Sequence, residues 1–199
     1  MKQLARLAPL FLTALASLAC FSACGPTRPP RGLDNPQIIV GSLSQVNPLD
    51  IVVLPIQNNT GRPNLPLAQL RQAFHAGMVH QKYSPLSLDY VDQRVVEAAY
   101  TPGTLNEQAI LQVFINSWDD SQWKSMSRLH IEAEVYLLDS KNPDQRQPLW
   151  GGKVDRHIDL GREMAGIPNS NAAMTRAIEK FTDDVLASLP PRNPELTTP

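Results

Sequence analysis

The sequence predicts an α/β fold, a mixed-sheet sandwich in a single domain that spans residues 49–189. A β-branched apolar run over 50–56 has the composition of a buried strand. Residues 128–139 alternate between apolar and polar side chains, the period of a strand with one buried face. Two segments, 67–78 and 174–189, repeat apolar residues at helical spacing. We expect the order strand, helix, strand, short helix, three strands, helix.

The first half of the domain opens with the strand 50–56 and with turn-forming residues over 58–62. Pro66 suits the first turn of the next helix, because a proline there gives up no helical hydrogen bond. Residues 87–91 predict a second strand, and Asp92 can cap a short helix that continues to residue 99.

The long apolar segment 109–118 predicts the third strand, with a helical start near Asn106 as the alternative. A polar loop over 119–127 follows and carries Trp123. The segments 128–139 and 149–160 then flank a turn and predict an antiparallel hairpin.

The last helix is expected to begin at Asn169 or Ser170, either of which can cap it. Its apolar stripe consists of Met174, Ile178, Phe181, Val185 and Leu189. Pro190 and Pro191 stop the helix because proline cannot continue the hydrogen-bond ladder. We expect 190–199 to be a disordered tail.

The first 23 residues have the pattern of an export signal. Lys2 and Arg6 give a positive start, an apolar run over 7–19 follows, and small residues close it. A transmembrane helix is the competing interpretation, but it needs about 20 apolar residues. Pro9 interrupts this run, and a proline-rich polar stretch begins directly after it. We therefore predict a cleaved signal over 1–23 and a proline-rich tether over 24–48.

Cys20 and Cys24 are the two cysteines of the chain. Because both lie at the front, no cysteine of the domain itself is left to form a disulfide. The segment Phe21-Ser22-Ala23-Cys24-Gly25 resembles a bacterial lipobox, in which two small residues precede the modified cysteine. The resemblance implies that Cys24 becomes the acylated N-terminus of a lipoprotein. The alternative is that both cysteines belong to the signal and the product is simply secreted.

The charge balance does not favour nucleic acid as a partner. The chain has 18 basic and 19 acidic residues, and removal of the signal leaves 16 basic residues against 19 acidic ones, a formal charge of −3. A nucleic-acid interface normally shows a basic patch or a run of five or more Lys and Arg. The sequence shows neither.

Catalytic and metal-binding patterns are weak. No Gly-x-Ser-x-Gly elbow, glycine-rich phosphate loop or His-x-x-x-His pair is present in the sequence. His130, Glu132 and Glu134 share one strand face and could supply metal ligands, but a solvated polar face is the better interpretation. Residues 155–157, Asp-Arg-His, could form an acid–base cluster, but a charged edge strand explains them better. We therefore expect no metal, no cofactor and no enzymatic activity.

Three tryptophans are candidates for contacts. Trp150 opens a strand and is expected to pack in the core or at its rim. Trp118 and Trp123 flank a loop, where aromatic side chains can anchor an interface. Asn58 and Asn59 could face a partner from their turn, although turn chemistry alone explains them.

The order of the motifs resembles a group of periplasmic lipoproteins. Residues 51–61, Ile-Val-Val-Leu-Pro-Ile-Gln-Asn-Asn-Thr-Gly, are similar to the first strand and turn of that group. Residues 109–118 are similar to its central strand, and the strand 129–139 followed by Pro-Leu-Trp-Gly-Gly at 148–152 is similar to its closing hairpin. The group includes the curli-secretion lipoprotein CsgG, the exopolysaccharide-export lipoprotein PelC, the penicillin-binding-protein activator LpoB and the N-terminal domain of TolB.

The resemblance implies a non-catalytic assembly or accessory role in an envelope complex for secretion, polysaccharide export or wall synthesis. It implies an anchor in the outer membrane by N-terminal acyl chains, with envelope proteins or further copies of the chain as partners. The hairpin loop over 140–147 is longer than the resemblance leads us to expect, so the chain is not expected to be a close member of any one branch. The sequence shows no added transmembrane hairpin segments, so we do not expect a pore like that of CsgG. A different hypothesis is a periplasmic module that binds a glycan or another small ligand near Trp118 and Trp123.

Overall fold

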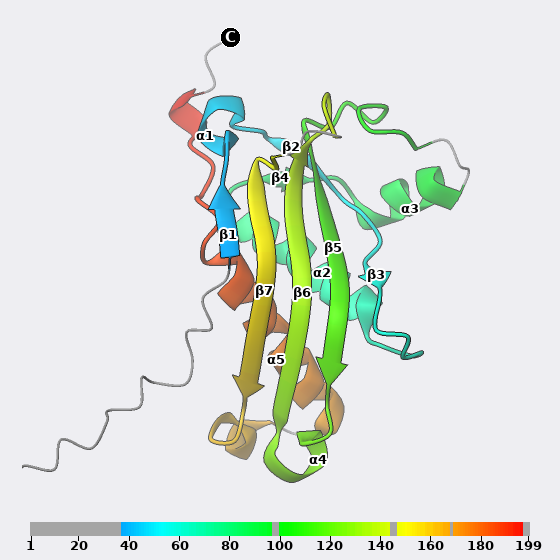
Figure 1. Ribbon diagram of the computed structural model, residues 1–199, viewed down its shortest axis with the longest axis vertical. Helices are drawn as coiled ribbons and strands as arrows, with labels where there is room; N and C mark the ends of the chain where they lie inside the picture. Colours follow the sequence, from blue (N-terminus) through cyan, green and yellow to red (C-terminus); the bar gives the residue numbers. More distant parts are fainter. Residues whose placement is uncertain (1–36, 97–99, 144–146, 168, 197–199) are drawn as a thin grey trace, which may run out of the picture. The chain divides into compact units, whose positions relative to one another are not determined.

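The computed structural model describes residues 37–96, 100–143, 147–167 and 169–196 (Figure 1), which belong to one compact unit over 32–199. The signal segment, Cys24 and the tether up to residue 36 lie outside the described residues. Within the described part, no helix is both long enough and apolar enough to span a membrane.

A mixed β-sheet forms the centre of the fold, in the order β1-β7-β6-β5-β2-β4, with the short β3 beside β5. Its strands are β1 (Gln37–Val40), β2 (Asp50–Val53), β3 (Gln57–Asn58), β4 (Ser84–Pro85), β5 (Ala109–Asp119), β6 (Arg128–Asp139) and β7 (Trp150–Asp159). The pairs β2–β4, β2–β5 and β3–β5 are parallel, and the pairs β5–β6, β6–β7 and β1–β7 are antiparallel. The predicted α/β mixed-sheet class and the closing hairpin are therefore confirmed.

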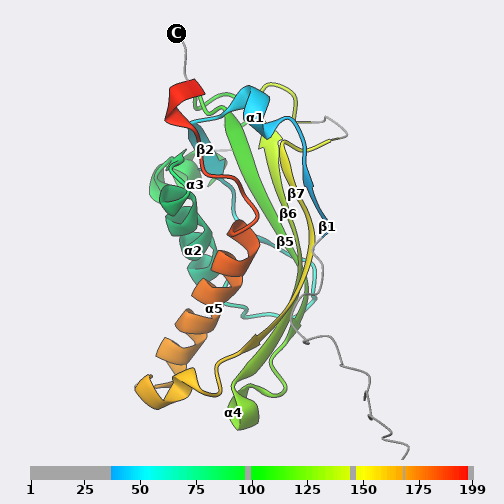
Figure 2. The same ribbon diagram turned by 90° about the vertical axis from the view of Figure 1, so that its left-hand side faces the viewer.

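The α-helices are α1 (Leu43–Val46), α2 (Leu67–His80), α3 (Leu88–Val96), α4 (Trp123–Met126) and α5 (Ser170–Leu186), with single 3-10 turns at Glu163–Gly166 and Pro194–Leu196. α2 and α5 lie side by side on one face of the sheet (Figure 2), which makes the two layers of the sandwich. Asn169 caps α5, as predicted, by accepting a hydrogen bond from the Ala172 amide at 2.9 Å.

The core lies between the sheet and the two long helices. Phe74 of α2 meets Phe181 of α5 edge to face, with ring centroids 6.3 Å apart. Gly77 allows this close approach, since a Cβ there would lie 2.4 Å from Cδ1 of Leu186. Trp150 is fully buried, which confirms its predicted core role, and its indole N–H donates to the Ser188 carbonyl at 3.2 Å.

A β-bulge in β5 changes which side chains reach the core. The register between β5 and β6 shifts between Ile115 and Ser117, so that Asn116 is the extra residue. Simple alternation from Ile115 would turn Trp118 outward. The bulge instead places Trp118 in the core opposite Ile131, and Asp119 on the outer face opposite His130.

The predicted strand over 87–91 is wrong, because residues 88–91 form the start of α3. Leu88, Val91 and Val95 recur at spacing three and four, and Val91 is fully buried in this helical register. The parallel partner of β2 at this edge is β4, a few residues earlier. Asp92 consequently does not cap the helix but lies within it, where it forms an ion pair with Arg71 of α2.

Two predicted boundaries also change. The tether does not extend to residue 48, because β1 pairs with β7 from Gln37 onward and α1 follows it. The first part of the predicted disordered tail packs back on the domain. The Tyr83 hydroxyl donates to the Pro190 carbonyl at 2.8 Å, and the Arg192 amide donates to the Gln81 carbonyl at 2.9 Å.

Three shorter predictions change in the same way. The first strand ends at Val53 rather than residue 56, since Pro55 has no N–H with which to continue the ladder. The predicted loop 119–127 contains α4. Asn106 has a positive φ of 60° and lies outside any helix, so the alternative helical start is excluded.

Candidate functional site

The turn after β3 is built by the side chain of Asn58. Its Oδ1 accepts hydrogen bonds from the amide and the hydroxyl of Thr60, at 3.0 and 2.7 Å, and its Nδ2 donates to the Arg62 carbonyl at 2.7 Å. This is the turn chemistry expected of Asn, and Gly61 supplies a positive φ of 71°. Asn58 is exposed, but its amide is committed to the turn.

The turn is held against the end of β5. The Asn59 amide donates to the Ile115 carbonyl at 2.8 Å, and its side chain donates to Asn116 Oδ1 at 3.1 Å. Arg62 then reaches across the strand end. Its Nη1 donates to the Trp118 carbonyl at 2.6 Å, and its Nη2 pairs with Asp120 Oδ1 at 2.9 Å.

These contacts border a pocket of about 380 Å³, which we name the Arg62 pocket. Its walls come from the segment after β3, the start of α2, the end of β5 and the first turns of α5. The lining residues are Arg62, Pro63, Asn64, Leu65, Pro66, Gln69, Trp118, Asp120, Asn171 and Met174. The volume lies at the lower end of the range for small-molecule sites.

The lining of the Arg62 pocket combines two kinds of surface. An indole, a thioether and a leucine side chain supply apolar contact area, while Arg62 and Asp120 form an ion pair at the rim. Both charged side chains are partly exposed, 47% for Arg62 and 36% for Asp120. A pair this exposed contributes little to stability. The Arg62 guanidinium and the Asp120 carboxylate can therefore separate and each pair with a group of a bound molecule at a small cost in free energy.

The structure brings together part of the predicted contact set. Trp118 lines the Arg62 pocket but is only 4% exposed, and Asn58 and Asn59 lie in the adjoining turn with exposed side chains. Trp123 begins α4 and is partly buried against the core. The contact role of these four residues stays a prediction. Their arrangement makes the pocket and its turn, rather than an exposed tryptophan, the candidate surface.

Sequence reasoning missed Arg62, Asp120 and Met174. The spacing of the apolar stripe does contain Met174, but it gives no sign that the start of α5 faces the turn after β3. Arg62 and Asp120 are 58 residues apart and meet because β3 and β5 are parallel neighbours.

A buried carboxylate near β5 has a structural use. Glu107 is 3% exposed and accepts hydrogen bonds from the Gly103 and Leu105 amides, at 2.7 and 2.9 Å, and from the Tyr100 hydroxyl at 2.8 Å. Burial, followed by the hydrogen bond and the charge of Glu107, raises the pKa of Tyr100 above its usual value. The cluster closes the loop ahead of β5.

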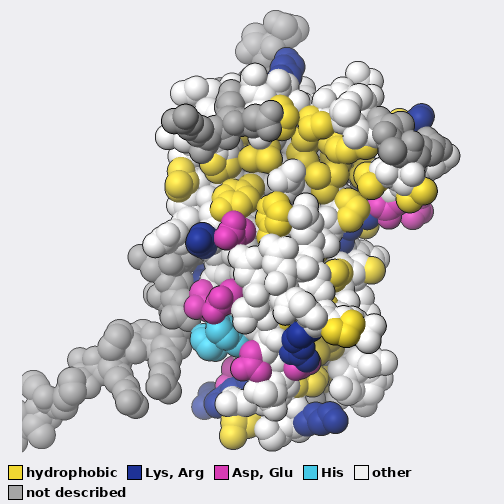
Figure 3. Space-filling model, turned by 45° about the vertical axis from the view of Figure 1, so that its right-hand side comes forward, with side chains coloured by type: hydrophobic (Ala, Val, Ile, Leu, Met, Phe, Trp, Pro, Cys, Tyr) yellow, Lys and Arg dark blue, Asp and Glu magenta, His cyan; other side chains and the backbone are white. Residues whose placement is uncertain are grey.

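The outer face of β5, β6 and β7 carries the other polar candidates. Apolar side chains gather in the upper half of this side of the molecule, and histidine and most of the charged side chains in the lower half (Figure 3). The rings of Phe114 in β5 and Tyr136 in β6 meet at a centroid distance of 6.5 Å. Glu134 accepts hydrogen bonds from Asn116 at 3.3 Å and from Tyr136 at 3.1 Å, so it is part of a polar surface network. His130 has different neighbours, Asp155 and His157, which sequence reasoning had treated as a separate cluster.

In comparisons with known proteins, the fold of this chain is similar to those of several solved structures. No protein-family model matches the chain, and no curated protein sequence matches it. The PelC dodecamer from Paraburkholderia phytofirmans is 13% identical, with 79% of this chain and 97% of that chain covered and a TM-score of 0.47. The lipoprotein GNA1162 from Neisseria meningitidis is 18% identical, with 71% and 99% covered and a TM-score of 0.46.

The LpoB C-terminal domain from Salmonella enterica is 11% identical, with 54% of this chain and 81% of that chain covered and a TM-score of 0.38. PelC and LpoB are both in the group of lipoproteins that the sequence resembles.

Proposed function

We propose that this protein is a lipid-anchored accessory protein of the bacterial outer membrane that binds another envelope protein and catalyses no reaction. The anchor rests on the lipobox-like segment that ends at Cys24. The acyl chains would hold the domain at the membrane, since each buried methylene contributes about 0.8 kcal/mol and more than one chain is needed.

The observation that carries the binding role is the Arg62 pocket. It presents an ion pair, amide groups and apolar side chains within one concavity. A polypeptide loop offers the same mixture of charges, amides and apolar groups. Its volume of about 380 Å³ accommodates a few side chains rather than a large cofactor. The occupant we propose is therefore a loop of an envelope protein.

The anchor is tested by Cys24→Ser in the native host, with Cys20→Ser as the matched control. We expect the Cys24 variant to fold but to leave the membrane fraction. The Cys20 variant should stay in it, because Cys20 would be removed with the signal. A Cys24→Ser protein that still fractionates with the outer membrane would contradict the lipobox assignment.

The binding role is tested by photo-crosslinking from single positions. A crosslinkable residue at Asn64, in the Arg62 pocket, should capture a defined envelope protein. The same residue at Asp183, exposed on α5, should not. Equal capture from both positions, or capture from neither, would contradict the proposed contact.

A second candidate function is a periplasmic module for a glycan or another small polar ligand. The same pocket favours it, because Trp118 lines the cavity beside polar groups. Cell-wall fragments should then change the intrinsic tryptophan fluorescence, and Trp118→Phe should remove the response. Unchanged fluorescence together with protein crosslinks at Asn64 would select the accessory role.

A further inference from the structure

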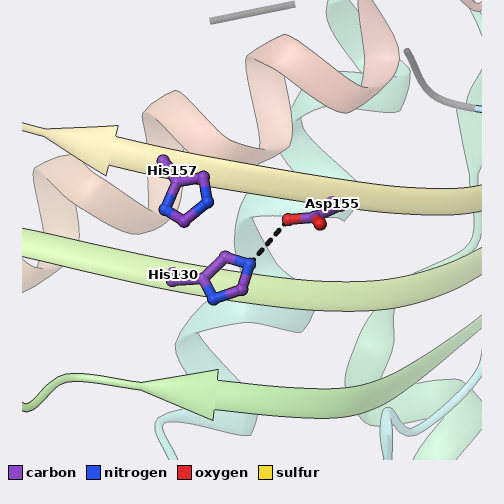
Figure 4. Close-up of side chains that lie close together, drawn as sticks. All are labelled: His130, Asp155 and His157. Atoms are coloured by element: carbon purple, nitrogen blue, oxygen red, sulfur yellow. Dashed lines mark hydrogen bonds and ion pairs between the residues drawn. The ribbon is translucent and has the colours of Figure 1, made fainter. Parts of the chain in front are cut away.

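The β6–β7 hairpin places three metal-ligating side chains together on the outer face of the sheet. His130 of β6 and His157 of β7 are direct partners in the antiparallel register, and Asp155 precedes His157 by one full strand repeat. All three side chains therefore leave the same face of the sheet. Figure 4 shows them side by side, two from β7 and one from β6.

Their ligand atoms are close enough for one ion. One nitrogen from each imidazole and one oxygen of Asp155 all lie within 4.8 Å of one another. His130 Nε2 and Asp155 Oδ1 are 2.6 Å apart, and the two imidazole rings stack at a centroid distance of 4.0 Å and an angle of 9°. Ligands about 2.1 Å from a tetrahedral ion lie about 3.4 Å apart. Small rotations of the exposed Asp155 and His157 side chains would cover the difference.

We propose that His130, Asp155 and His157 bind a divalent transition-metal ion, with Zn²⁺ as its representative. Two imidazoles and a carboxylate are three ligands that Zn²⁺ commonly takes, and water completes the coordination. Mg²⁺ and Ca²⁺ prefer oxygen ligands alone, so the two histidines select against them.

The surroundings of the three residues favour a cation. Asp119 is the β5 partner of His130, and Glu132 is the β6 partner of Asp155, so two further carboxylates flank the cluster on the same face. Figure 3 shows acidic side chains next to the histidine, with Lys and Arg side chains also nearby. The Asp119 carboxylate accepts a hydrogen bond from the Ser121 amide at 2.9 Å, which keeps it in place beside His130.

The scaffold is rigid where the ligands attach. β6 and β7 pair continuously from Arg128 opposite Asp159 to Leu137 opposite Trp150, so the backbone positions of all three residues are fixed by the ladder. A site on two paired strands needs little ordering when the ion binds. Imidazole binds a metal ion through an unprotonated ring nitrogen. When the ion binds, the hydrogen bond between His130 and Asp155 is replaced by one metal–ligand bond from each residue.

The chain contains four histidines, which supplies a matched control. His80 is exposed on α2, away from the hairpin, so His80→Ala removes one imidazole without touching the site. The test variants are His157→Ala and Asp155→Asn, both at exposed positions where substitution leaves the core unchanged.

The experiment titrates the mature chain with ZnCl₂ by calorimetry and with CoCl₂ by visible absorption. The expected result is one ion per chain and a Co²⁺ spectrum typical of low coordination number. Loss of either ligand should weaken Zn²⁺ binding at least ~10-fold, and His80→Ala should bind as the original chain does. Excess MgCl₂ should not compete.

Three outcomes would overturn the proposal: no Zn²⁺ binding, equal binding by His157→Ala and the original chain, or equal weakening by His80→Ala. Circular dichroism of each variant shows whether the fold is intact. If His157→Ala fails to fold, Asp155→Asn, which keeps the size of the side chain, carries the test.

Discussion

Gly151 in β7 is a buried glycine, paired with β6 on one side and β1 on the other, that should not tolerate a side chain. It has a φ of +129°, a conformation that side chains rarely adopt. A Cβ there would lie 2.1 Å from the Val135 carbonyl oxygen and 2.8 Å from the Tyr136 Cα. Both atoms are backbone of β6, so the clash cannot be relieved by a side-chain rotation. β7 would have to move away from β6.

The expected loss of stability in Gly151→Ala follows from the positive φ and from the clash with the β6 backbone. The unfavourable φ costs about 1–3 kcal/mol by itself. The clash with the β6 backbone adds to it, so we expect Gly151→Ala to lower the free energy of unfolding by more than ~3 kcal/mol. A domain is stable by only about 5–15 kcal/mol, so this loss is a large part of the total.

Two other glycines separate the cost of the positive φ from the cost of the clash. Gly61 has a φ of +71° but nothing within 4 Å of its Cβ position, so Gly61→Ala reports the backbone term without the clash. We expect it to cost about 1–2 kcal/mol. Gly166 has nothing within 4 Å and no positive φ, so Gly166→Ala should stay within about 0.5 kcal/mol of the original chain.

Urea denaturation of the mature chain measures all three variants, because the midpoint and slope give the free energy of unfolding. The predicted order of loss is Gly151, then Gly61, then Gly166. A Gly151→Ala variant that loses no more stability than Gly61→Ala would refute the close contact between the β6 and β7 backbones.

Two further predictions concern buried polar groups. Arg71 donates to the Val53 carbonyl from Nε at 3.0 Å and from Nη2 at 2.8 Å, and it also pairs with Asp92. Arg71→Met leaves the carbonyl and Asp92 without their cation, so it should lower the free energy of unfolding by about 3 kcal/mol in urea denaturation. A loss below ~1 kcal/mol would contradict a structural role of Arg71. Burial raises the pKa of Tyr83 to about 12, partly offset by the charge of Arg192. Because the pKa of Tyr83 is higher in the folded than in the unfolded protein, ionisation of its hydroxyl lowers the free energy of unfolding. The stability of the protonated state is complete below about pH 10 and is lost as the pH rises toward 12. Tyr83→Phe should therefore flatten the alkaline loss of stability in thermal melts from pH 9 to 12, and an unchanged profile would exclude Tyr83 as its source.

The elements with strong periodicity were predictable, and those that depend on distant partners were not. The alternation of β6 and the stripes of α2 and α5 carry their own signal, since each buries one face. The prediction of a strand at 87–91 was wrong because a pattern of only four or five apolar and polar residues fits a strand and a helical turn equally well. The fully buried Val91 shows that contact with the rest of the fold decided the outcome.

The candidate sites depend on the pairing register of the strands, which cannot be read from a single sequence. The alternation of β5 is visible, but the bulge at Asn116 is not, and it is the bulge that buries Trp118. The hairpin was predicted, yet its loop length left the pairing open, so His130 and His157 could not be placed opposite each other. Arg62 and Asp120 likewise meet only through the parallel pairing of β3 with β5.

The edge strand β1 sets how far the domain can reach. If Cys24 is the anchored residue, the connection to Gln37 spans 13 residue steps, which extend to at most about 45 Å. A connection that continued to residue 49 would extend to about 85 Å. If the proposed anchor holds, pairing of β1 with β7 therefore nearly halves the distance that the domain can move from the membrane and reduces the accessible volume about sevenfold. A partner would then have to present its contact surface in a shallow layer next to the membrane.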